Sequence, residues 1–220
     1  MVQKHILLIN PNTTSSMTQK IGAAARHAAG PAVKITAVNP ATGPSAIQGA
    51  EDGRNALPGL FKTFEDHVLE HRGVDAVIIA CFDDTGLWEL KRMSPVPVLG
   101  IGEAAYHAAS LYAERFSVVT TLPVSVPVLE RNLDLIGLAR RCAKVRASNV
   151  PVLELEDPES PARHRIEAEI NLAIKEDDVG AIALGCAGMA DLAADLSRQF
   201  EIPVIDGVAA ATRFAEQLVS

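Results

Sequence analysis

Val74-Asp-Ala-Val-Ile-Ile-Ala-Cys81 and Val179-Gly-Ala-Ile-Ala-Leu-Gly-Cys186 are two apolar stretches of equal length, and each ends in a cysteine. They lie 105 positions apart. A second pair, Val96–Gly102 and Ile202–Gly207, follows them with nearly the same offset. Short β-rich runs of this kind, separated by helical stretches, are typical of α/β proteins with parallel sheets. The repeat therefore predicts two related α/β lobes.

The beginnings of the two halves match more loosely. His5–Asn10 precedes the polar turn Pro11–Thr14, and Phe116–Thr121 precedes Leu122–Ser125. The lobes are expected at 1–105 and 106–207, with the C-terminal helix 208–220 completing the first lobe. The periodicity of apolar residues predicts helices between the strands, at Ser15–Ala29, Pro58–Arg72, Glu103–Glu114, Val126–Ile136, Pro161–Glu176, Asp191–Phe200 and Val208–Val219. The acidic, proline-rich Pro151–Pro161 stretch is expected to be a surface loop.

Composition excludes several classes of function. Charged residues make up 21% and hydrophobic residues 48% of the 220 residues, as in a compact globular protein. The formal net charge is -7 and the basic residues are scattered, so nucleic acid is an unexpected partner. The first residues lack the pattern of a signal peptide, and no stretch is long and apolar enough to span a membrane. The three cysteines are expected to be free thiols in a cytoplasmic protein.

The loops that follow parallel strands meet at one edge of a sheet, where open α/β proteins bind ligands. Two facing lobes would bring Cys81 and Cys186 to opposite sides of one cleft. Inversion at a carbon acid needs a base on one face and an acid on the other, which two thiols can supply. A helix N-terminus lowers the pKa of a thiol, so a thiolate near neutral pH is expected. Backbone N–H groups of both cysteine turns could stabilise an enolate.

Each of these residues also has a purely structural interpretation. Unpaired cysteines are often small buried hydrophobes, and Cys142, which has no counterpart in the other half, is assigned to that class. Asp83 and Asp84 could be ligands or helix caps. The Asn10–Thr14 turn could bind a ring or cap a helix. His67 and His71 have metal-ligand spacing, but charged neighbours favour a solvated helix face.

Six motifs make the chain resemble the Asp/Glu/hydantoin racemases, in particular the hydantoin and allantoin racemase branch. They span nearly the whole sequence and comprise Ile9–Thr13, Ile79–Leu87, Pro97–Ala104, Ser117–Pro123, Leu184–Met189 and Pro203–Gly207. The resemblance implies two flavodoxin-like lobes around a cleft, a homo-oligomer and no cofactor or metal. It also implies Cys81 and Cys186 as the catalytic pair.

The same resemblance implies the residues of the ring pocket, with Ile47 facing the 5-substituent and the others around the ring: Asn10, Phe82, Asp83, Thr121, Ala187 and Gly188. The chain departs from the branch at Gln48, where an acidic residue is common. The expected activity is racemisation of 5-substituted hydantoins, allantoin included. A related decarboxylase, a cis-trans isomerase, an aspartate or glutamate racemase and a non-catalytic metabolite-binding protein are the alternatives.

Overall fold

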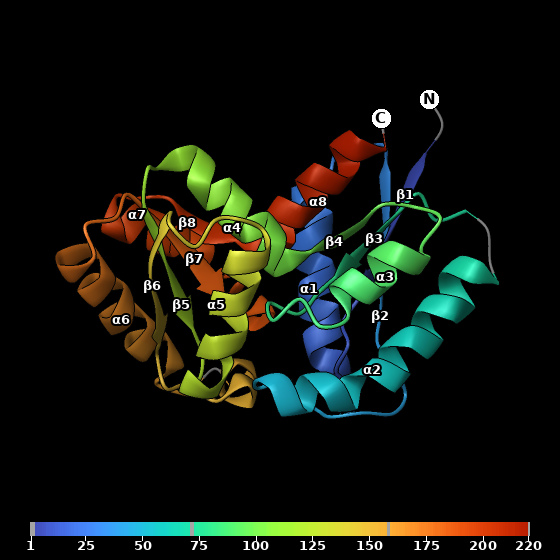
Figure 1. Cartoon of the computed structure of the whole chain (residues 1–220), viewed down its shortest axis with the longest axis horizontal. Coiled ribbons are helices and arrows are strands. Elements are labelled where there is room, and N and C mark those ends of the chain that lie inside the picture. Colours follow the sequence, from blue (N-terminus) through green and yellow to red (C-terminus); the bar gives the residue numbers. More distant parts are fainter. Residues whose placement is uncertain (1–2, 71–72, 158, 220) are drawn as a thin grey trace.

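The chain forms two four-stranded parallel sheets with the same strand order (Figure 1). The computed structural model describes residues 3–70, 73–157 and 159–219. The first sheet has the order β2-β1-β3-β4 and the second the order β6-β5-β7-β8. Their bounds are β1 Lys4–Ile9, β2 Val33–Val38, β3 Ala76–Ile79, β4 Val98–Gly100, β5 Phe116–Thr120, β6 Cys142–Ala147, β7 Ala181–Gly185 and β8 Val204–Asp206. The predicted α/β class with two similar sets of parallel strands is confirmed.

Helices connect consecutive strands. The α-helices are α1 Ser15–Ala28, α2 Ala50–Phe64, α3 Leu87–Met93, α4 Ile101–Tyr112, α5 Val126–Leu135, α6 Ala162–Glu176, α7 Ala193–Phe200 and α8 Gly207–Leu218. Shorter turns are the π-helix η1 Glu65–Leu69 and the 3-10 helices η2 Pro123–Ser125, η3 Val152–Glu156 and η4 Ala187–Met189. Each pair of consecutive strands is thus joined by a helical crossover, as parallel strands need.

Three helical features differ from what the sequence predicts. The helix predicted to start at Pro58 begins at Ala50, and Pro58 lies inside it. Proline favours the first helical turn, which suggested the wrong start; the helix begins where Gly49, with φ 91°, turns the chain. The helix α3 was not anticipated. The predicted loop Pro151–Pro161 contains the short helix η3.

The central strands β1, β3, β5 and β7 are largely apolar because both faces of each sheet are covered, as usual for parallel sheets. In β1, Ile6 and Leu8 belong to a central core that also contains Phe116 and Val118 of β5. The helices α1, α4, α5 and α8 contribute to this central core, whereas α2 and α3 cover the outer face of the first sheet. The helices α6 and α7 cover the outer face of the second. One continuous core therefore joins the two sheets.

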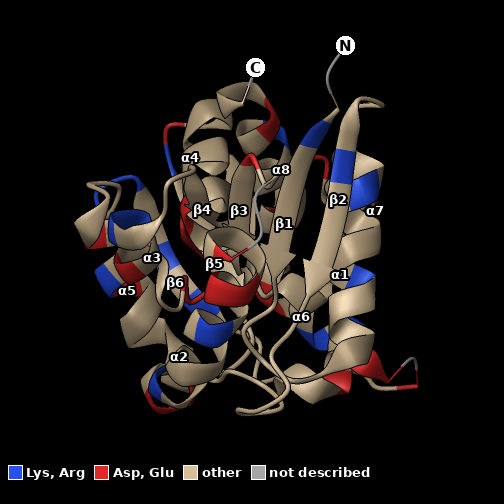
Figure 2. Ribbon diagram, turned by 90° about the vertical axis from the view of Figure 1, so that its right-hand side faces the viewer, with Lys and Arg blue, Asp and Glu red and all other residues tan. Residues whose placement is uncertain are grey.

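The last helix, α8, packs against α1 and β1 but also contacts α4 and β7. Its assignment to the first lobe and the lobe boundaries stay predictions. Figure 2 shows Lys and Arg interspersed with Asp and Glu on several elements rather than gathered in one patch in that view. Among residues 3–70, 73–157 and 159–219, no helix is long and apolar enough to cross a membrane.

Candidate active site

The carboxyl ends of the central strands of both sheets face one small cavity. Of the site residues predicted from sequence, the cavity is lined by Asn10, Ile47, Cys81, Phe82, Asp83, Thr121, Cys186 and Ala187. Asn10 directly follows β1 and Thr121 directly follows β5. The strand order reverses between β1 and β3, and likewise between β5 and β7, which is where α/β sheets bind ligands. The repeat thus brings the two cysteines together.

Gly188 lies beside this cavity rather than in its lining. Its N–H donates to the Cys186 thiol, and a Cβ on Gly188 would lie 3.7 Å from Cys186 Sγ and 2.9 Å from Leu155 Cδ1. A side chain at this position would require the Leu155 side chain, which packs over the turn, to shift.

Six further residues line the cavity that the sequence analysis did not assign to the site: Asn12, Met17, Ala80, Ser125, Val152 and Gly185. Val152 comes from η3, in the stretch expected to be a surface loop, and it is buried. Its N–H donates to Gln48 Oε1 at 3.0 Å, so the Gln48 side chain ties η3 to the turn before α2. Val152 is recognised as a cavity residue only through a contact between the two halves of the chain, and no sequence pattern indicates it. Asn12, in contrast, belongs to the Asn10–Thr14 motif.

The Asn10–Thr14 turn is held by its own side chains. Asn10 Nδ2 donates to Asn12 Oδ1 at 2.9 Å and to Thr18 Oγ1 at 3.0 Å. Asn12 Oδ1 also accepts the backbone N–H of Thr14 at 2.9 Å. Thr14 makes no side-chain cap bond to α1. The motif therefore fixes the position of Asn10 at the cavity, rather than capping the helix.

Both cavity thiols have raised pKa values, contrary to the expected thiolate near neutral pH. Burial raises the pKa of Cys81 strongly, and the charge of Asp83 adds to it; the Thr85 hydroxyl, 3.6 Å from the sulfur, acts in the opposite direction. Burial likewise raises the pKa of Cys186 to about 11. Desolvation disfavours the charged thiolate more than the short turns at these positions favour it. A thiolate formed here is correspondingly a stronger base.

Asp83 is the ionisable group that both thiols share. Burial raises its pKa to about 7, although the Gly49 N–H and the Ser125 hydroxyl favour the carboxylate. Asn132 Nδ2, on α5, donates to the Asp83 backbone oxygen at 2.9 Å. Asp83 is therefore held from the second half of the chain, and its charge raises the pKa of Cys81 and of Cys186.

Asp84 has a structural role, which separates it from Asp83. Its carboxylate accepts the backbone N–H groups of Gly102 at 3.0 Å and Glu103 at 2.7 Å, at the start of α4. These bonds hold Asp84 at φ 50°, a left-handed conformation that aspartate tolerates better than most residues. Gly100 and Gly102 are needed because a Cβ there would lie 2.0 Å from Asp84 Oδ1 or 2.4 Å from the Phe82 oxygen.

The remaining candidates do not join the site. His67 lies in η1, away from the cavity lining, and His71 lies outside the described residues. Among the described residues, no group of three or more His, Cys, Asp and Glu side chains could hold a metal ion. Cys142 begins β6 and packs against the central core.

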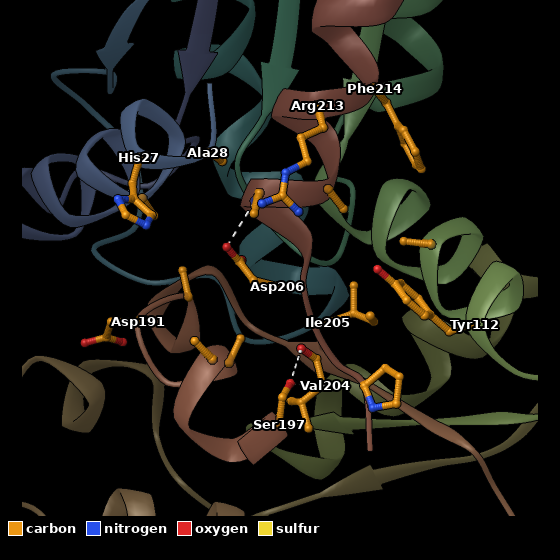
Figure 3. A pocket seen from close by; sticks show the side chains of 18 of the residues that line it. His27, Ala28, Tyr112, Asp191, Ser197, Val204, Ile205, Asp206, Arg213 and Phe214 are labelled. Atoms are coloured by element: carbon orange, nitrogen blue, oxygen red, sulfur yellow. Dashed lines mark hydrogen bonds between the residues drawn. The ribbon is translucent and has the colours of Figure 1, made fainter. Parts of the chain in front are cut away.

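A larger cavity of about 1070 Å³ lies between α1, α4, α7, α8 and β8 (Figure 3). Alanines form much of its wall. The half-buried Asp206 carboxylate in this cavity already accepts the N–H groups of Val208 and Ala209 as the N-cap of α8. The Ser197 hydroxyl is bound to Val204. No cysteine lines this cavity, so we place the chemistry in the smaller one.

Comparison with known proteins identifies the family. The Asp/Glu/hydantoin racemase model matches residues 6–215. The chain belongs to the Asp/Glu/hydantoin racemase family. It is 43% identical over 215 residues to the hydantoin racemase of Rhizobium meliloti, covering 98% of this chain and 88% of that one.

Solved structures agree with this assignment. The allantoin racemase from Klebsiella pneumoniae is 42% identical, with a TM-score of 0.94 over 98% of this chain and 87% of that chain. A liganded mutant of arylmalonate decarboxylase is 14% identical, with a TM-score of 0.69 over 99% of this chain and 93% of that chain. The second likeness concerns the fold alone, so the two-lobed fold by itself does not select among reactions.

Proposed function

We propose that this family member is a cofactor-independent racemase of 5-substituted hydantoins, allantoin included. The observation that carries the proposal is the meeting of Cys81 and Cys186, from equivalent strands, at one cavity. The similarity to a hydantoin racemase and an allantoin racemase over 98% of the chain supports the substrate class. The chain is then an isomerase that acts on a small molecule.

In the proposed reaction, a thiolate on one face of the ring removes the C5 proton. The electron pair moves into the adjacent carbonyl to give an enolate, and the thiol on the other face protonates C5. The two cysteines exchange roles for the opposite enantiomer. Burial makes each thiolate a stronger base, and backbone N–H groups of the cysteine turns would stabilise the enolate oxygen.

Substrate entry requires the site to open. The cavity volume is about 30 Å³, which holds no more than one or two water molecules. A substituted five-membered ring is far larger. Because residues of both halves of the chain line the cavity, we infer that the turn carrying Ile47 and the η3 segment move apart to admit the ring, and then close over it.

The reaction and its residues can be tested together. Single enantiomers of allantoin and of 5-benzylhydantoin are incubated with the protein in D2O, and optical rotation and deuterium at C5 are followed against an enzyme-free blank. We expect rotation to decay to zero with one deuterium incorporated. The proposal would be replaced by another activity if hydantoins were unaffected. That activity would be shown by loss of carbon dioxide from an arylmalonate, racemisation of aspartate or glutamate, or isomerisation of maleate. Binding without turnover of any of them would leave a metabolite-binding protein.

Asp83→Asn is expected to shift to lower pH the limb of the pH profile over which kcat/KM rises as a thiolate forms. The carboxylate raises the pKa of both thiols, so removing its charge lowers both pKa values and makes the thiolate available at lower pH. The measurement is kcat/KM from about pH 6 to about pH 10. Asp134→Asn, on the exposed part of α5, is the matched control and should leave the profile unchanged. A shift to higher pH would contradict the role given to Asp83.

Assembly and location stay predictions. We propose a homo-oligomer located in the cytoplasm, as expected from the sequence. Size-exclusion chromatography with light scattering would test the assembly.

A further inference from the structure

Lys20 joins α1 to the second half of the chain, beside the Cys186 turn. Its ammonium lies 3.4 Å from Asp191 Oδ2 and donates to the Leu155 oxygen at 3.3 Å. Figure 3 shows Asp191 at the border of the larger cavity, away from Arg213 and Phe214. Lys20 also lines that cavity. It reaches these partners from α1, which packs against β2 and α8 and also contacts η4.

The two contacts of Lys20 flank Cys186. Leu155 packs over Gly188, whose N–H donates to the Cys186 thiol. Asp191 follows η4, the short helix that begins directly after Cys186. Lys20 therefore holds both the segment above the cysteine turn and the segment that leaves it.

Lys20 is also the cation among the charges that act on Cys186. Burial is the main cause that raises the pKa of the Cys186 thiol to about 11. The Asp83 and Glu156 carboxylates also disfavour the thiolate, whereas Lys20 and the Gly188 N–H favour it. No cation of the described residues stands among the main groups that act on Cys81, where the Thr85 hydroxyl lies 3.6 Å from the sulfur. The two halves repeat in fold but differ in the groups that stabilise their thiolates.

We propose that Lys20 is a positioning residue for Cys186: across the two halves of the chain, its ammonium holds the cysteine turn and supplies the positive charge for that thiolate. This role rests on the proposed racemase function. It makes the two thiols chemically unequal, with Cys186 supported by a cation and Cys81 by a hydroxyl.

Two variants that break the same ion pair separate this role from a structural one. Lys20→Met removes the cation, whereas Asp191→Asn removes the anion and leaves the cation in place. Alkylation by iodoacetamide is followed between about pH 7 and about pH 11, and each cysteine is quantified by peptide mass spectrometry. The Cys81 rate serves as the internal reference in each variant. The Leu155 oxygen remains a partner for Lys20 when Asp191 is replaced.

We expect Lys20→Met to slow alkylation of Cys186 relative to Cys81 by roughly threefold to tenfold at about pH 8, as expected for loss of a nearby opposite charge. Lys20→Arg keeps the positive charge, so its rate of Cys186 alkylation relative to Cys81 should be close to that of the wild type. In Asp191→Asn, iodoacetamide should alkylate Cys186 at least as fast as it does in the wild type. Equal slowing in Lys20→Met and Asp191→Asn, or an unchanged ratio of Cys186 to Cys81 in Lys20→Met, would overturn the proposal. Because alkylation needs no hydantoin turnover, its outcome is separate from a failure of the racemase assay.

Discussion

Cys186→Ser is expected to lower kcat/KM for racemisation by about 10²–10⁴-fold, the range typical of a lost general acid or base. Serine keeps the shape of the side chain, but its hydroxyl is a far weaker acid than a thiol. Cys81→Ser should cause a loss of similar size. Since two enantiomers have the same free energy in solution, kcat/KM must fall equally in both directions for each variant.

The half-reactions should reveal which thiol faces which side of the ring. Each single variant retains one thiol, so it should still exchange the C5 proton of one enantiomer in D2O without inverting it. The enantiomer whose C5 proton still exchanges should differ between Cys81→Ser and Cys186→Ser. NMR of C5 deuterium in each enantiomer, corrected for the enzyme-free rate, measures this exchange.

Cys142→Ser is the matched control, because Cys142 packs against the central core at the start of β6 and does not line the cavity. It should keep nearly full activity. Full racemisation in either cavity variant, or loss of both exchange reactions in each single variant, would contradict a mechanism with one thiol on each face.

Gly102→Ala is expected to lower kcat/KM by roughly 10- to 100-fold, because small displacements of catalytic groups are costly. The added Cβ would lie 2.4 Å from the Phe82 backbone oxygen and 2.8 Å from Asp84 Oδ2. The turn between Cys81 and Gly86 would have to move, and Cys81 with it. Overpacking of this kind also lowers the free energy of unfolding, by about 1–3 kcal/mol. Steady-state kinetics and urea unfolding measure the two effects.

Gly53→Ala provides the control for the same chemical change. Gly53 lies within α2, and a Cβ there would meet its nearest atom, Thr85 Oγ1, at 3.6 Å, an ordinary contact distance. Alanine in a helix interior is favoured over glycine by up to about 1 kcal/mol. This variant should therefore be slightly more stable than the wild type and should keep its activity. Near-wild-type kinetics in Gly102→Ala would show that the turn tolerates displacement.

The edge strands and α3 show why parts of the fold escaped prediction. In β2 and β6, charged or polar residues such as Lys34, Thr36, Lys144 and Arg146 interrupt the apolar runs. Both are edge strands, which pair on one side only, and their sequences are less apolar than those of β1, β3, β5 and β7. The helix α3 has only seven residues, too few to show a clear period. Proline at position 58 favoured a helix start that the tertiary structure does not use.

The sequence alone determined the repeat, the α/β class and most of the cavity lining. It could do so because buried parallel strands need continuous apolar runs, and because the loops after such strands must meet at one edge of a sheet. The equal spacing of Cys81 and Cys186 from their strands was sufficient to place both at that edge.

Only the tertiary structure decided what surrounds the thiols. Contacts between residues far apart in the chain place η3 over the cavity and bring Lys20 to Asp191. Such contacts also give Asp83 and Asp84 different roles. The thiol pKa values likewise follow from burial, which outweighs the local turn. Desolvation is set by everything that packs around a group, so a short motif cannot encode it.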